Sequence, residues 1–324
     1  MNGRPAVVVL GATAEDPPPG IGAAAAVAEL RFAADGGSLP GALRGASALL
    51  AWGAERRWLE DAWEAAEDLR WIQAASDGVD RLLFPELAER GVVVTNARGI
   101  FDDAIGEWVV GVMLAMSTGL ATSIADQQRR RWDHDRRTRR LAGTRLLSVG
   151  PGPIGRAVAV RAHALGMEIA AVGRAARQDP LFGRIGGPED FARMLGAADV
   201  ILDVLPLTPE TRHRFDAAAF AAMRPTARFV NVGRGGTVDE TALIDALRRG
   251  AIGGAALDVF EREPLPEDSP LWTMPNVIVS PHLCGDVEGW EADVVRLFVD
   301  NLGRFVRGEP LRNRVDLTLG FGVG

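Results

Sequence analysis

Three residues with complementary chemistry each follow an apolar run that has the length of a strand. Arg234 stands in a glycine-rich turn after one run, Glu263 follows the next, and His282 follows the last. Reducing a 2-keto acid requires a cation that holds the carboxylate, and a guanidinium can do so with two parallel hydrogen bonds. It also requires a proton donor for the keto oxygen and a carboxylate that favours the protonated donor. We therefore take Arg234, His282 and Glu263 as candidate catalytic residues.

Each of these residues has a simpler interpretation when it is considered alone. Arg234 could be a surface residue in a turn, Glu263 could be a solvated side chain, and His282 could cap a loop. The three form one site only if the fold brings the ends of their strands together. The carboxyl ends of the strands in an open α/β sheet are where such folds bind ligands.

The stretch 144–174 predicts a fold of this kind. An apolar run, Leu146–Val149, is followed by glycines in G-x-G-x-x-G spacing, a helical run and a second apolar run, Ile169–Val172. In this strand–turn–helix–strand unit, the glycines and the helix N-terminus bind the pyrophosphate of a dinucleotide. The alternative is a purely structural turn. The candidate cofactor-binding residues of this unit are Gly150, Gly152, Pro153, Ile154 and Gly155.

The length of 324 residues and the pattern of apolar runs predict two α/β domains. The expected strands of the first domain are Val7–Leu10, Ala48–Ala51, Trp71–Gln73 and Val92–Thr95. Those that follow the fingerprint in the second domain are Val200–Leu205, Phe229–Val232, Gly254–Val259 and Val277–Ser280. Expected helices include Gly22–Leu30, Arg57–Leu69, Phe101–Leu120, Thr241–Arg249 and Glu288–Val306, the last returning to the first domain. We expect a substrate domain of residues 1–98 and 287–324, interrupted by a doubly wound, dinucleotide-binding Rossmann domain of residues 99–286.

Composition excludes several classes of function. The net charge of −7 argues against general binding to nucleic acid or to a membrane surface. The chain contains no Lys and no Tyr, so Schiff-base lysine chemistry, a P-loop lysine and a Tyr/Lys catalytic pair are excluded. A single Cys and four His argue against a zinc alcohol-dehydrogenase site, and we expect no metal.

Two further expectations follow from what the sequence lacks. Cys284 is the only cysteine, so no internal disulfide can form. No apolar run reaches transmembrane length and none has the form of a secretory signal, so we expect a cytoplasmic protein. The Arg-rich segment 127–140 is interpreted as a solvated arm or a subunit contact.

Four ordered motifs carry a family resemblance. They are V-L-P-L-T-P-E-T-R-H (204–213), V-N-V-G-R-G-G-T-V-D-E-T-A-L (230–243), G-G-A-A-L-D-V-F-E-R-E-P-L-P (253–266) and S-P-H (280–282). Together they resemble the D-isomer-specific 2-hydroxyacid dehydrogenases, of the glyoxylate/hydroxypyruvate reductase kind, over roughly residues 69–285. The resemblance implies a flavodoxin-like substrate domain built from both chain ends, an inserted Rossmann domain and a homodimer.

The resemblance also implies roles for individual residues. Arg234 binds the substrate, His282 is the acid/base, Glu263 pairs with His282, and Asp258 holds the nicotinamide carboxamide. The backbone of the Asp77–Gly78 turn receives the substrate carboxylate. The remaining cofactor-binding candidates are Arg174, Leu205, Pro206, Thr211 and Val232. The chain departs from the family at Asp77, where a small apolar residue is usual and an acidic one could repel the substrate, and at Pro151 in the fingerprint.

The end of the second fingerprint strand predicts the choice of cofactor. NAD-specific Rossmann domains place an acidic residue there, which binds the ribose 2′-hydroxyl. Here the strand ends at Gly173-Arg174, and the nearest acidic residue is Asp179. Gly173 leaves room, and Arg174, with Arg177 near it, can pair with a 2′-phosphate, so we expect NADP(H) to be preferred over NAD(H). Alternatively, Arg174 is a surface residue that stacks on adenine and accepts either cofactor.

The leading functional hypothesis is an NAD(P)-dependent oxidoreductase that reduces a small 2-keto acid, such as glyoxylate, hydroxypyruvate or a bulkier analogue, to the D-2-hydroxy acid. A hypothesis from another class is a dinucleotide-sensing binding protein of the corepressor type, which shares the fold and these residues. A formate-dehydrogenase-like enzyme is a third, but it pairs its histidine with Gln, and Glu263 argues against it.

Overall fold

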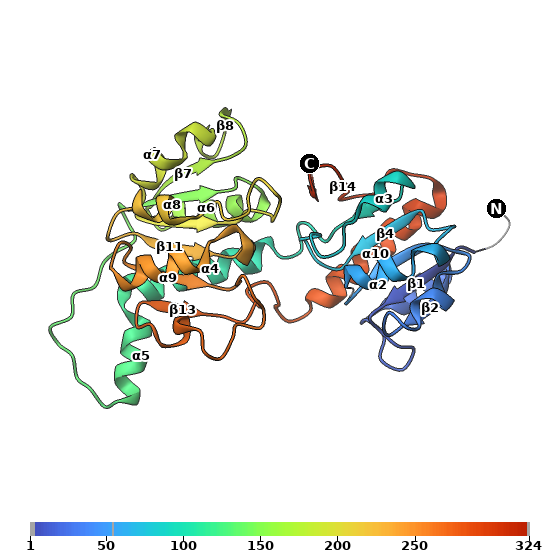
Figure 1. Cartoon of the computed structure of the whole chain (residues 1–324), viewed down its shortest axis with the longest axis horizontal. Helices are drawn as coiled ribbons and strands as arrows, with labels where there is room; N and C mark the ends of the chain where they lie inside the picture. The colour runs from blue at the N-terminus through green and yellow to red at the C-terminus, as the bar shows by residue number, and fades with distance from the viewer. Residues whose placement is uncertain (1–3, 54, 323–324) are drawn as a thin grey trace. The chain divides into compact units, whose positions relative to one another are not determined.

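The computed structural model describes residues 4–53 and 55–322, which form two α/β units (Figure 1). The first unit comprises Met1–Phe101 and Glu288–Gly324, and the second comprises Asp102–Val287. The boundaries expected from the sequence are 98/99 and 286/287. Each unit is built around one sheet, and the predicted α/β fold class is confirmed.

The sheet of the first unit is entirely parallel. Its strands are β1 (Ala6–Leu10), β2 (Glu29–Ala33), β3 (Ala46–Ala51), β4 (Trp71–Ala74) and β5 (Val93–Thr95), in the order β2-β1-β3-β4-β5. Strands β1, β3 and β4 are buried along their whole length, because helices cover both faces of such a sheet. This strand order is that of flavodoxin-like folds.

Two predicted helices of the first unit are wrong in extent. The stretch Gly22–Leu30 forms only a 3₁₀ helix, η1 (Ile21–Ala26), and its end already belongs to β2. Strand β2 lies at the edge of the sheet and is only partly buried, so it lacks the apolar run of the inner strands. The stretch Arg57–Leu69 is broken into α2 (Arg56–Asp61) and η2 (Trp63–Ala65).

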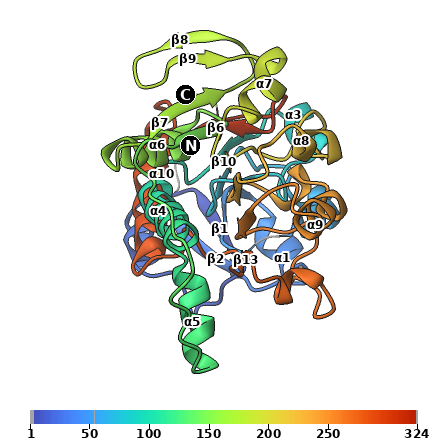
Figure 2. The same cartoon turned by 90° about the vertical axis from the view of Figure 1, so that its left-hand side faces the viewer.

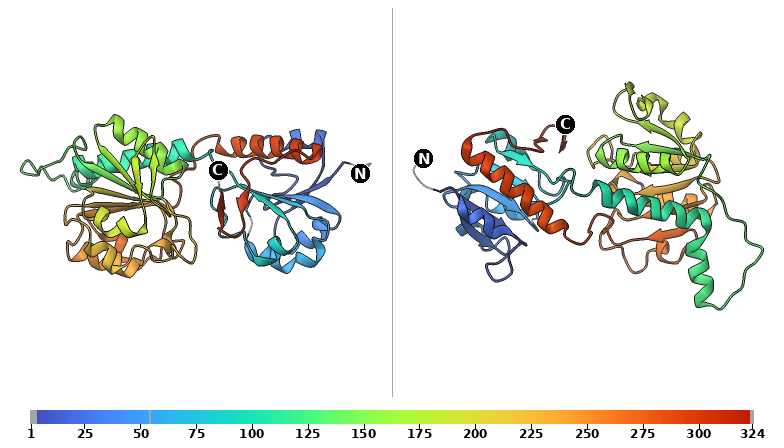
Figure 3. Two further views of the ribbon diagram at one scale, coloured as in Figure 1. Left: turned by 90° about the horizontal axis from the view of Figure 1, so that it is seen from above. Right: turned by 180° about the vertical axis from the view of Figure 1, so that it is seen from behind.

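The C-terminal helix belongs to the first unit. Helix α10 (Trp290–Arg307) lies along one face of the sheet (Figure 3), where Phe298 stacks on Trp71 with ring centroids 5.4 Å apart. Short helices α1 (Leu39–Leu43) and α3 (Pro85–Glu89) and a terminal pair of strands, β14 (Val315–Asp316) and β15 (Phe321–Gly322), complete the unit. Chain segments from both ends therefore share one core.

The second unit contains a doubly wound sheet. Its strands are β6 (Arg145–Val149), β7 (Glu168–Val172), β8 (Arg177–Asp179), β9 (Gly183–Gly186), β10 (Val200–Asp203), β11 (Arg228–Asn231), β12 (Gly254–Leu257) and β13 (Val277–Val279). The order is β13-β12-β11-β10-β6-β7-β9-β8, parallel except for β8. From β6 the chain adds strands on one side through β7, β9 and β8, and it then crosses to β10 and adds strands on the other side. This switch point between β6 and β10 is where Rossmann folds bind a dinucleotide. The predicted Rossmann fold is confirmed.

Helices cover both faces of this sheet. Figure 2 shows α4 (Asp102–Thr118) and α6 (Pro153–Ala164) on one side and α8 (Ala217–Ala221) and α9 (Glu240–Arg248) on the other. Helix α7 (Phe191–Leu195) and the 3₁₀ helices η3 (Pro188–Asp190), η4 (Gly235–Thr237) and η5 (Pro270–Thr273) lie in the connections. The loops that follow β6, β10, β11 and β12 thus all emerge at the carboxyl edge of one sheet.

The predicted helix Phe101–Leu120 ends earlier than expected. Gly119 adopts a left-handed conformation with φ 69°, and α5 (Leu120–Gln128) continues from it at an angle of 68°. Among the described residues, no single helix is long and apolar enough to cross a membrane; α4 and α5 meet that criterion only as a bent pair. Helix α5 and the Arg-rich segment after it extend away from the rest of the second unit (Figure 1).

A buried polar side chain ties α10 to the sheet of the first unit. The Asn301 amide group donates hydrogen bonds to Gln73 Oε1 (3.0 Å) and to the carbonyl of Arg312 (3.2 Å), and its oxygen accepts one from the Arg312 amide (2.8 Å). Because Asn301 is fully buried, water cannot replace these partners.

We expect Asn301→Ala to lower the free energy of unfolding of the first unit by about 2–3 kcal/mol, since it leaves buried donors and acceptors without partners. Urea denaturation followed by tryptophan fluorescence would measure the change. The control is Arg296→Ala on an exposed part of the same helix, for which we expect a change within about 0.5 kcal/mol. Equal stability of the two variants would contradict this role.

Candidate active site

The structure brings His282 and Glu263 together. Nδ1 of His282 lies 2.9 Å from Oε2 of Glu263, and the other carboxylate oxygen accepts a hydrogen bond from the amide of Phe260 (3.1 Å). The Glu263 carboxylate is therefore held at both oxygens. The His282 side chain is 43% exposed, and its Nε2 is on the side of the ring away from Glu263. This nitrogen can exchange a proton with a ligand while Glu263 orients the ring.

Asp258 fixes the loop that carries His282. Its side chain is fully buried just after β12, where its two oxygens accept hydrogen bonds from the amides of Leu283 and Cys284 (both 3.1 Å). Bonds to an ionised carboxylate are stronger than those between neutral groups. They hold His282 in a left-handed backbone conformation, φ 56°. The contacts show Asp258 supporting the loop, whereas the resemblance implies a contact to the nicotinamide carboxamide.

Two further titratable groups lie beside this loop. Partial burial raises the pKa of the Asp286 carboxyl, the His282 imidazole acts in the opposite direction, and the Asp258 carboxylate adds to the increase. Burial and the Asp258 carboxylate raise the pKa of the Cys284 thiol, which is therefore a poor nucleophile. Asp286 is not among the site residues expected from the sequence. The one feature of the sequence that could have pointed to it is its position four residues after His282.

Arg234 lies in a loop that packs tightly against its neighbours. A Cβ atom on Gly233 would collide with the Leu205 backbone, and one on Gly235 would collide with the Phe260 carbonyl. The loops after β10, β11 and β12 therefore touch through their backbones, with half-buried Arg234 between the two glycines. Its guanidinium Nη1 donates a hydrogen bond to the carbonyl of Gly233 (2.8 Å).

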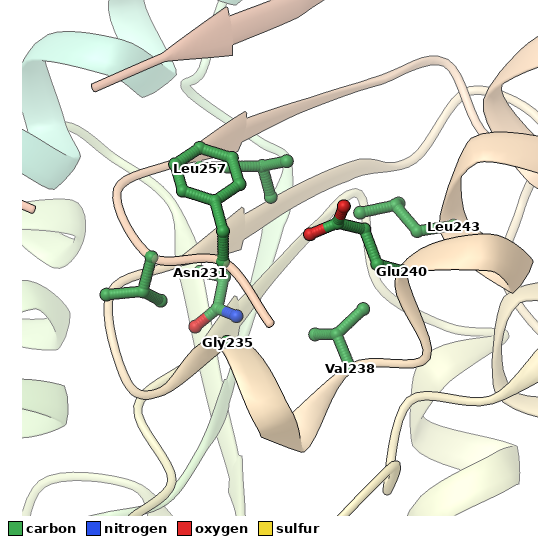
Figure 4. A pocket seen from close by; sticks show the side chains of 8 residues that line it. Asn231, Gly235, Val238, Glu240, Leu243 and Leu257 are labelled. Carbon is green, nitrogen blue, oxygen red and sulfur yellow. The ribbon is translucent and has the colours of Figure 1, made fainter. Parts of the chain in front are cut away.

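A small cavity lies behind the Arg234 loop (Figure 4). Its polar side chains are Asn231 and Glu240, and the rest of its wall is Gly235, Val238, Leu243, Leu257, Val259 and Phe260. Its volume is about 10 Å³, which is room for one water molecule at most. The cavity is therefore too small for a keto acid or a nicotinamide ring.

The turn after β6 has the features that a pyrophosphate needs. Gly150 has φ 106°, a backbone conformation that side chains rarely allow, and Gly155 packs against the Gly150 carbonyl so closely that no Cβ would fit. A Cβ on Gly152, by contrast, would meet no protein atom within 4 Å. Gly152 is the residue before α6, whose first turn leaves backbone N–H groups such as that of Ile154 without an intrahelical partner, while Pro153 carries no N–H. The residues present thus fit a dinucleotide.

The other predicted cofactor residues lie at the same edge of the sheet. Leu205 and Pro206 follow β10, and buried Val232 follows β11. The Thr211 hydroxyl donates a hydrogen bond to the Pro206 carbonyl (2.6 Å) and accepts one from the Thr208 amide (2.8 Å). In this structure, Thr211 therefore shapes the loop that begins with Leu205.

The first acidic residue after β7 already has a structural role. Asp179 is buried, forms an ion pair with Arg156, and accepts hydrogen bonds from the amides of Leu181 and Phe182. The Arg156 guanidinium lowers the pKa of this carboxyl to about 2. Arg174 is exposed just after β7. A Cβ atom added to Gly173 would lie 3.2 Å from the Pro151 ring and 3.4 Å from the Ile185 side chain, so a glycine here lets the fingerprint turn pack closely on the end of the strand.

The Asp77–Gly78 turn lies in the first unit, after β4. Asn96 Nδ2 donates hydrogen bonds to the Asp77 carbonyl (2.7 Å) and to its carboxylate (3.0 Å), and the Ser76 hydroxyl donates to the Gly78 carbonyl (2.7 Å). The Asp77 side chain is thus turned towards Asn96. These bonds account for an acidic residue at this position.

Comparisons with known proteins agree with this architecture. The family model described as "D-isomer specific 2-hydroxyacid dehydrogenase, NAD binding domain" matches residues 110–284. Glyoxylate/hydroxypyruvate reductase B from Escherichia fergusonii is 35% identical over 259 residues, covering 78% of this chain and 80% of that protein. D-3-phosphoglycerate dehydrogenase from Methanocaldococcus jannaschii is 35% identical over 270 residues, covering 79% of this chain but only 49% of the longer relative.

A solved structure extends the similarity to almost the whole chain. The D-isomer specific 2-hydroxyacid dehydrogenase from Xanthobacter autotrophicus Py2, in complex with NADPH and MES, is 30% identical with a TM-score of 0.83, covering 98% of this chain and 100% of that one. The family match spans nearly all of the second unit, and the curated reductase is similar over most of its length. The chain therefore belongs to the D-isomer-specific 2-hydroxyacid dehydrogenases, which are oxidoreductases that act on CH–OH groups.

Proposed function

We propose that this protein reduces a small 2-keto acid, such as glyoxylate or hydroxypyruvate, to the D-2-hydroxy acid with NADPH as the preferred cofactor. The observation that carries the proposal is the His282–Glu263 pair, held beside the Arg234 loop at the carboxyl edge of a Rossmann sheet. The name of the Escherichia fergusonii relative supports glyoxylate and hydroxypyruvate as substrates.

In this proposal each residue has one task. Glu263 orients the His282 ring and stabilises its protonated, imidazolium form; His282 then gives the Nε2 proton to the keto oxygen and becomes neutral. Arg234 holds the substrate carboxylate, and the family resemblance implies the same task for the backbone of the Asp77–Gly78 turn. Asp258 keeps His282 in position through the Leu283 and Cys284 amides. A bound nicotinamide dinucleotide supplies the hydride that reduces the keto carbon.

The surroundings of β7 support NADPH. A carboxylate at the ribose would repel a 2′-phosphate, and the first acidic residue after β7, Asp179, is buried in its ion pair with Arg156. Arg174 lies directly after the strand, where a cation would attract the phosphate. The solved relative that contains NADPH adds weight to this choice. NADH remains the alternative cofactor.

We include a homodimer in the proposal. Helix α5 and the segment after it expose Leu120, Ile124 and Trp132, the last with 91% of its surface accessible. Apolar side chains exposed together are typical of contact surfaces. A second copy of the chain is the partner that the family resemblance implies.

Steady-state reduction of a panel of 2-keto acids, with NADPH and with NADH, tests the proposed function. We expect turnover of glyoxylate or hydroxypyruvate and a higher kcat/KM with NADPH. A protein that binds dinucleotide but reduces no keto acid would instead fit a dinucleotide-sensing role.

We expect His282→Ala to lower the rate of the chemical step by on the order of 10²–10⁴-fold, because it removes the proton donor. Glu263→Gln should shift the loss of reductase activity to a lower pH, since the amide does not stabilise the imidazolium. Glu261→Gln is the matched control, because it disrupts a second His–Glu pair, with His213 (2.6 Å). Superimposable pH–rate profiles for Glu263→Gln and wild type would remove Glu263 from the mechanism.

We expect Arg234→Lys to lower kcat/KM for keto acids by roughly 10²-fold, because lysine keeps the charge but loses the two-pronged geometry. NADPH affinity, measured by fluorescence titration, should change little. Arg262→Lys, on the exposed surface of a nearby loop, is the control. Near-wild-type kcat/KM in Arg234→Ala would show that the substrate carboxylate binds elsewhere.

We expect Arg174→Ala to raise KM for NADPH on the order of tenfold, with KM for NADH nearly unchanged, because only NADPH carries the 2′-phosphate. Arg248→Ala on the exposed face of α9 is the control. Wild-type enzyme with equal kcat/KM for the two cofactors would contradict the assignment of Arg174.

A further inference from the structure

A buried carboxyl group lies at the centre of the second unit with no role in the mechanism above. Asp203 is the last residue of β10, and its side chain is completely buried. One of its oxygens accepts a hydrogen bond from the Leu205 amide (3.0 Å), and the other lies 2.5 Å from the Thr237 hydroxyl. A buried carboxyl is rare unless it is paired or neutral.

The contacts of Thr237 connect this carboxyl to Arg234. The same Thr237 hydroxyl lies 2.6 Å from the backbone carbonyl of Arg234, which also accepts longer bonds from the Thr237 amide (3.2 Å) and from Asn231 Nδ2 (3.3 Å). Thr237 is completely buried, so no solvent can supply a further hydrogen. Asp203 is therefore linked directly to the Leu205 loop and, through Thr237, to the Arg234 loop.

Counting hydrogens in this network determines the form of Asp203. A threonine hydroxyl carries one hydrogen, yet Thr237 has two oxygen neighbours at bonding distance. If Asp203 were ionised, one of these contacts would hold two oxygens together without a hydrogen between them. If Asp203 is protonated, it donates to Thr237 and Thr237 donates to the Arg234 carbonyl, so every contact is a hydrogen bond.

The electrostatic surroundings agree with the neutral form. Burial raises the pKa of Asp203 to about 7, although the Thr237 hydroxyl and the Leu205 amide act in the opposite direction. Since this pKa lies near neutrality, the carboxyl loses its proton as the pH rises through about 7.

The charged residues of the neighbouring elements do not form an ion pair with Asp203 in the part of the chain that the structure describes. Arg145 of β6 and Arg228 of β11 stand at the amino ends of their strands, whereas Asp203 is at the carboxyl end of β10. Asp258 follows β12, which is separated from β10 by β11. Arg234, on the η4 side, directs its guanidinium Nη1 to the Gly233 carbonyl.

We propose that protonated Asp203 is a positioning residue that acts through Thr237 to hold the backbone of Arg234, and so sets the affinity for the substrate carboxylate. The inference rests on the proposed function for its substrate. Loss of the Asp203 proton draws the Thr237 hydrogen towards the carboxylate and removes the shortest of the bonds to the Arg234 carbonyl, which keeps those from the Thr237 amide (3.2 Å) and from Asn231 Nδ2 (3.3 Å).

Two variants separate the parts of this network. In Asp203→Asn, the amide oxygen still accepts from Leu205 and the amide nitrogen donates to Thr237, so this variant imitates the protonated acid at every pH. Thr237→Val keeps the shape of the side chain but removes the hydroxyl that joins Asp203 to the Arg234 carbonyl, while the bond from the backbone amide of residue 237 stays. Thr144→Val is the matched control, because the Thr144 hydroxyl also donates to a backbone carbonyl, that of Leu141 (2.6 Å).

Steady-state kinetics between pH 5.5 and 9 then test the proposal. We expect Thr237→Val to raise KM for the keto acid roughly tenfold at neutral pH, with kcat and NADPH affinity within about twofold of wild type. The ratio of kcat/KM in Asp203→Asn to that in wild type should rise as the pH increases through 7. An unchanged KM in Thr237→Val, or a ratio that does not vary with pH, would overturn the proposal.

Thermal melting gives a readout that does not require catalysis. A carboxyl whose folded pKa is raised loses stabilisation as the pH rises from its unfolded value near 4 to about 7. The Tm of Asp203→Asn relative to wild type should therefore increase over that interval and be constant above it. A constant Tm difference from pH 4 to 8 would overturn the assigned proton.

The two readouts also separate this inference from the proposed function. A wild type that reduces no keto acid contradicts the proposed function and the substrate part of this inference together. The Tm comparison decides the protonated network in either case.

Discussion

The candidate site depends on the close backbone packing of three loops at one edge of the second sheet. Gly233 and Gly235 let the loop after β11 touch the loops after β10 and β12, and a methyl group at either position would force them apart. Arg234 stands between these glycines. Phe260, which Gly235 contacts, also gives its amide to Glu263, which in turn binds His282. One run of contacts thus sets the positions of the cation, the carboxylate and the imidazole.

Four carboxyl groups of the second unit differ in what they do because their partners differ. Asp258 accepts two amide hydrogens and holds the His282 loop, whereas Glu263 divides its oxygens between a backbone amide and the imidazole. Asp179 is stabilised as an anion by Arg156. Asp203 has a hydroxyl and one amide, so burial dominates and favours the neutral acid. The partners of each carboxyl group therefore decide whether it anchors a loop, contacts an imidazole, forms an ion pair or favours its neutral form.

The sequence predicted the parts of the fold that long apolar runs and specific motifs encode. The inner strands, the fingerprint turn and the proximity of Glu263 and His282 are of this kind. It did not predict strand β2 or the β8–β9 pair, because edge strands are short and partly polar and lack a buried run. It also missed the Asp203–Thr237 pair, whose members are 34 residues apart in the chain and meet only through sheet register and the tight turn at η4. Local pattern cannot reveal a contact that tertiary packing creates.

The central claim is that Arg234 and His282 face the two ends of a 2-keto acid while a phosphorylated dinucleotide occupies the turn after β6. A crystal structure of the protein with NADPH and oxamate, an unreactive keto-acid analogue, would test it most directly. We expect the oxamate carboxylate on the Arg234 guanidinium, its amide carbonyl oxygen within hydrogen-bond distance of His282 Nε2, and the 2′-phosphate against Arg174. An oxamate bound without contact to either Arg234 or His282 would contradict the account.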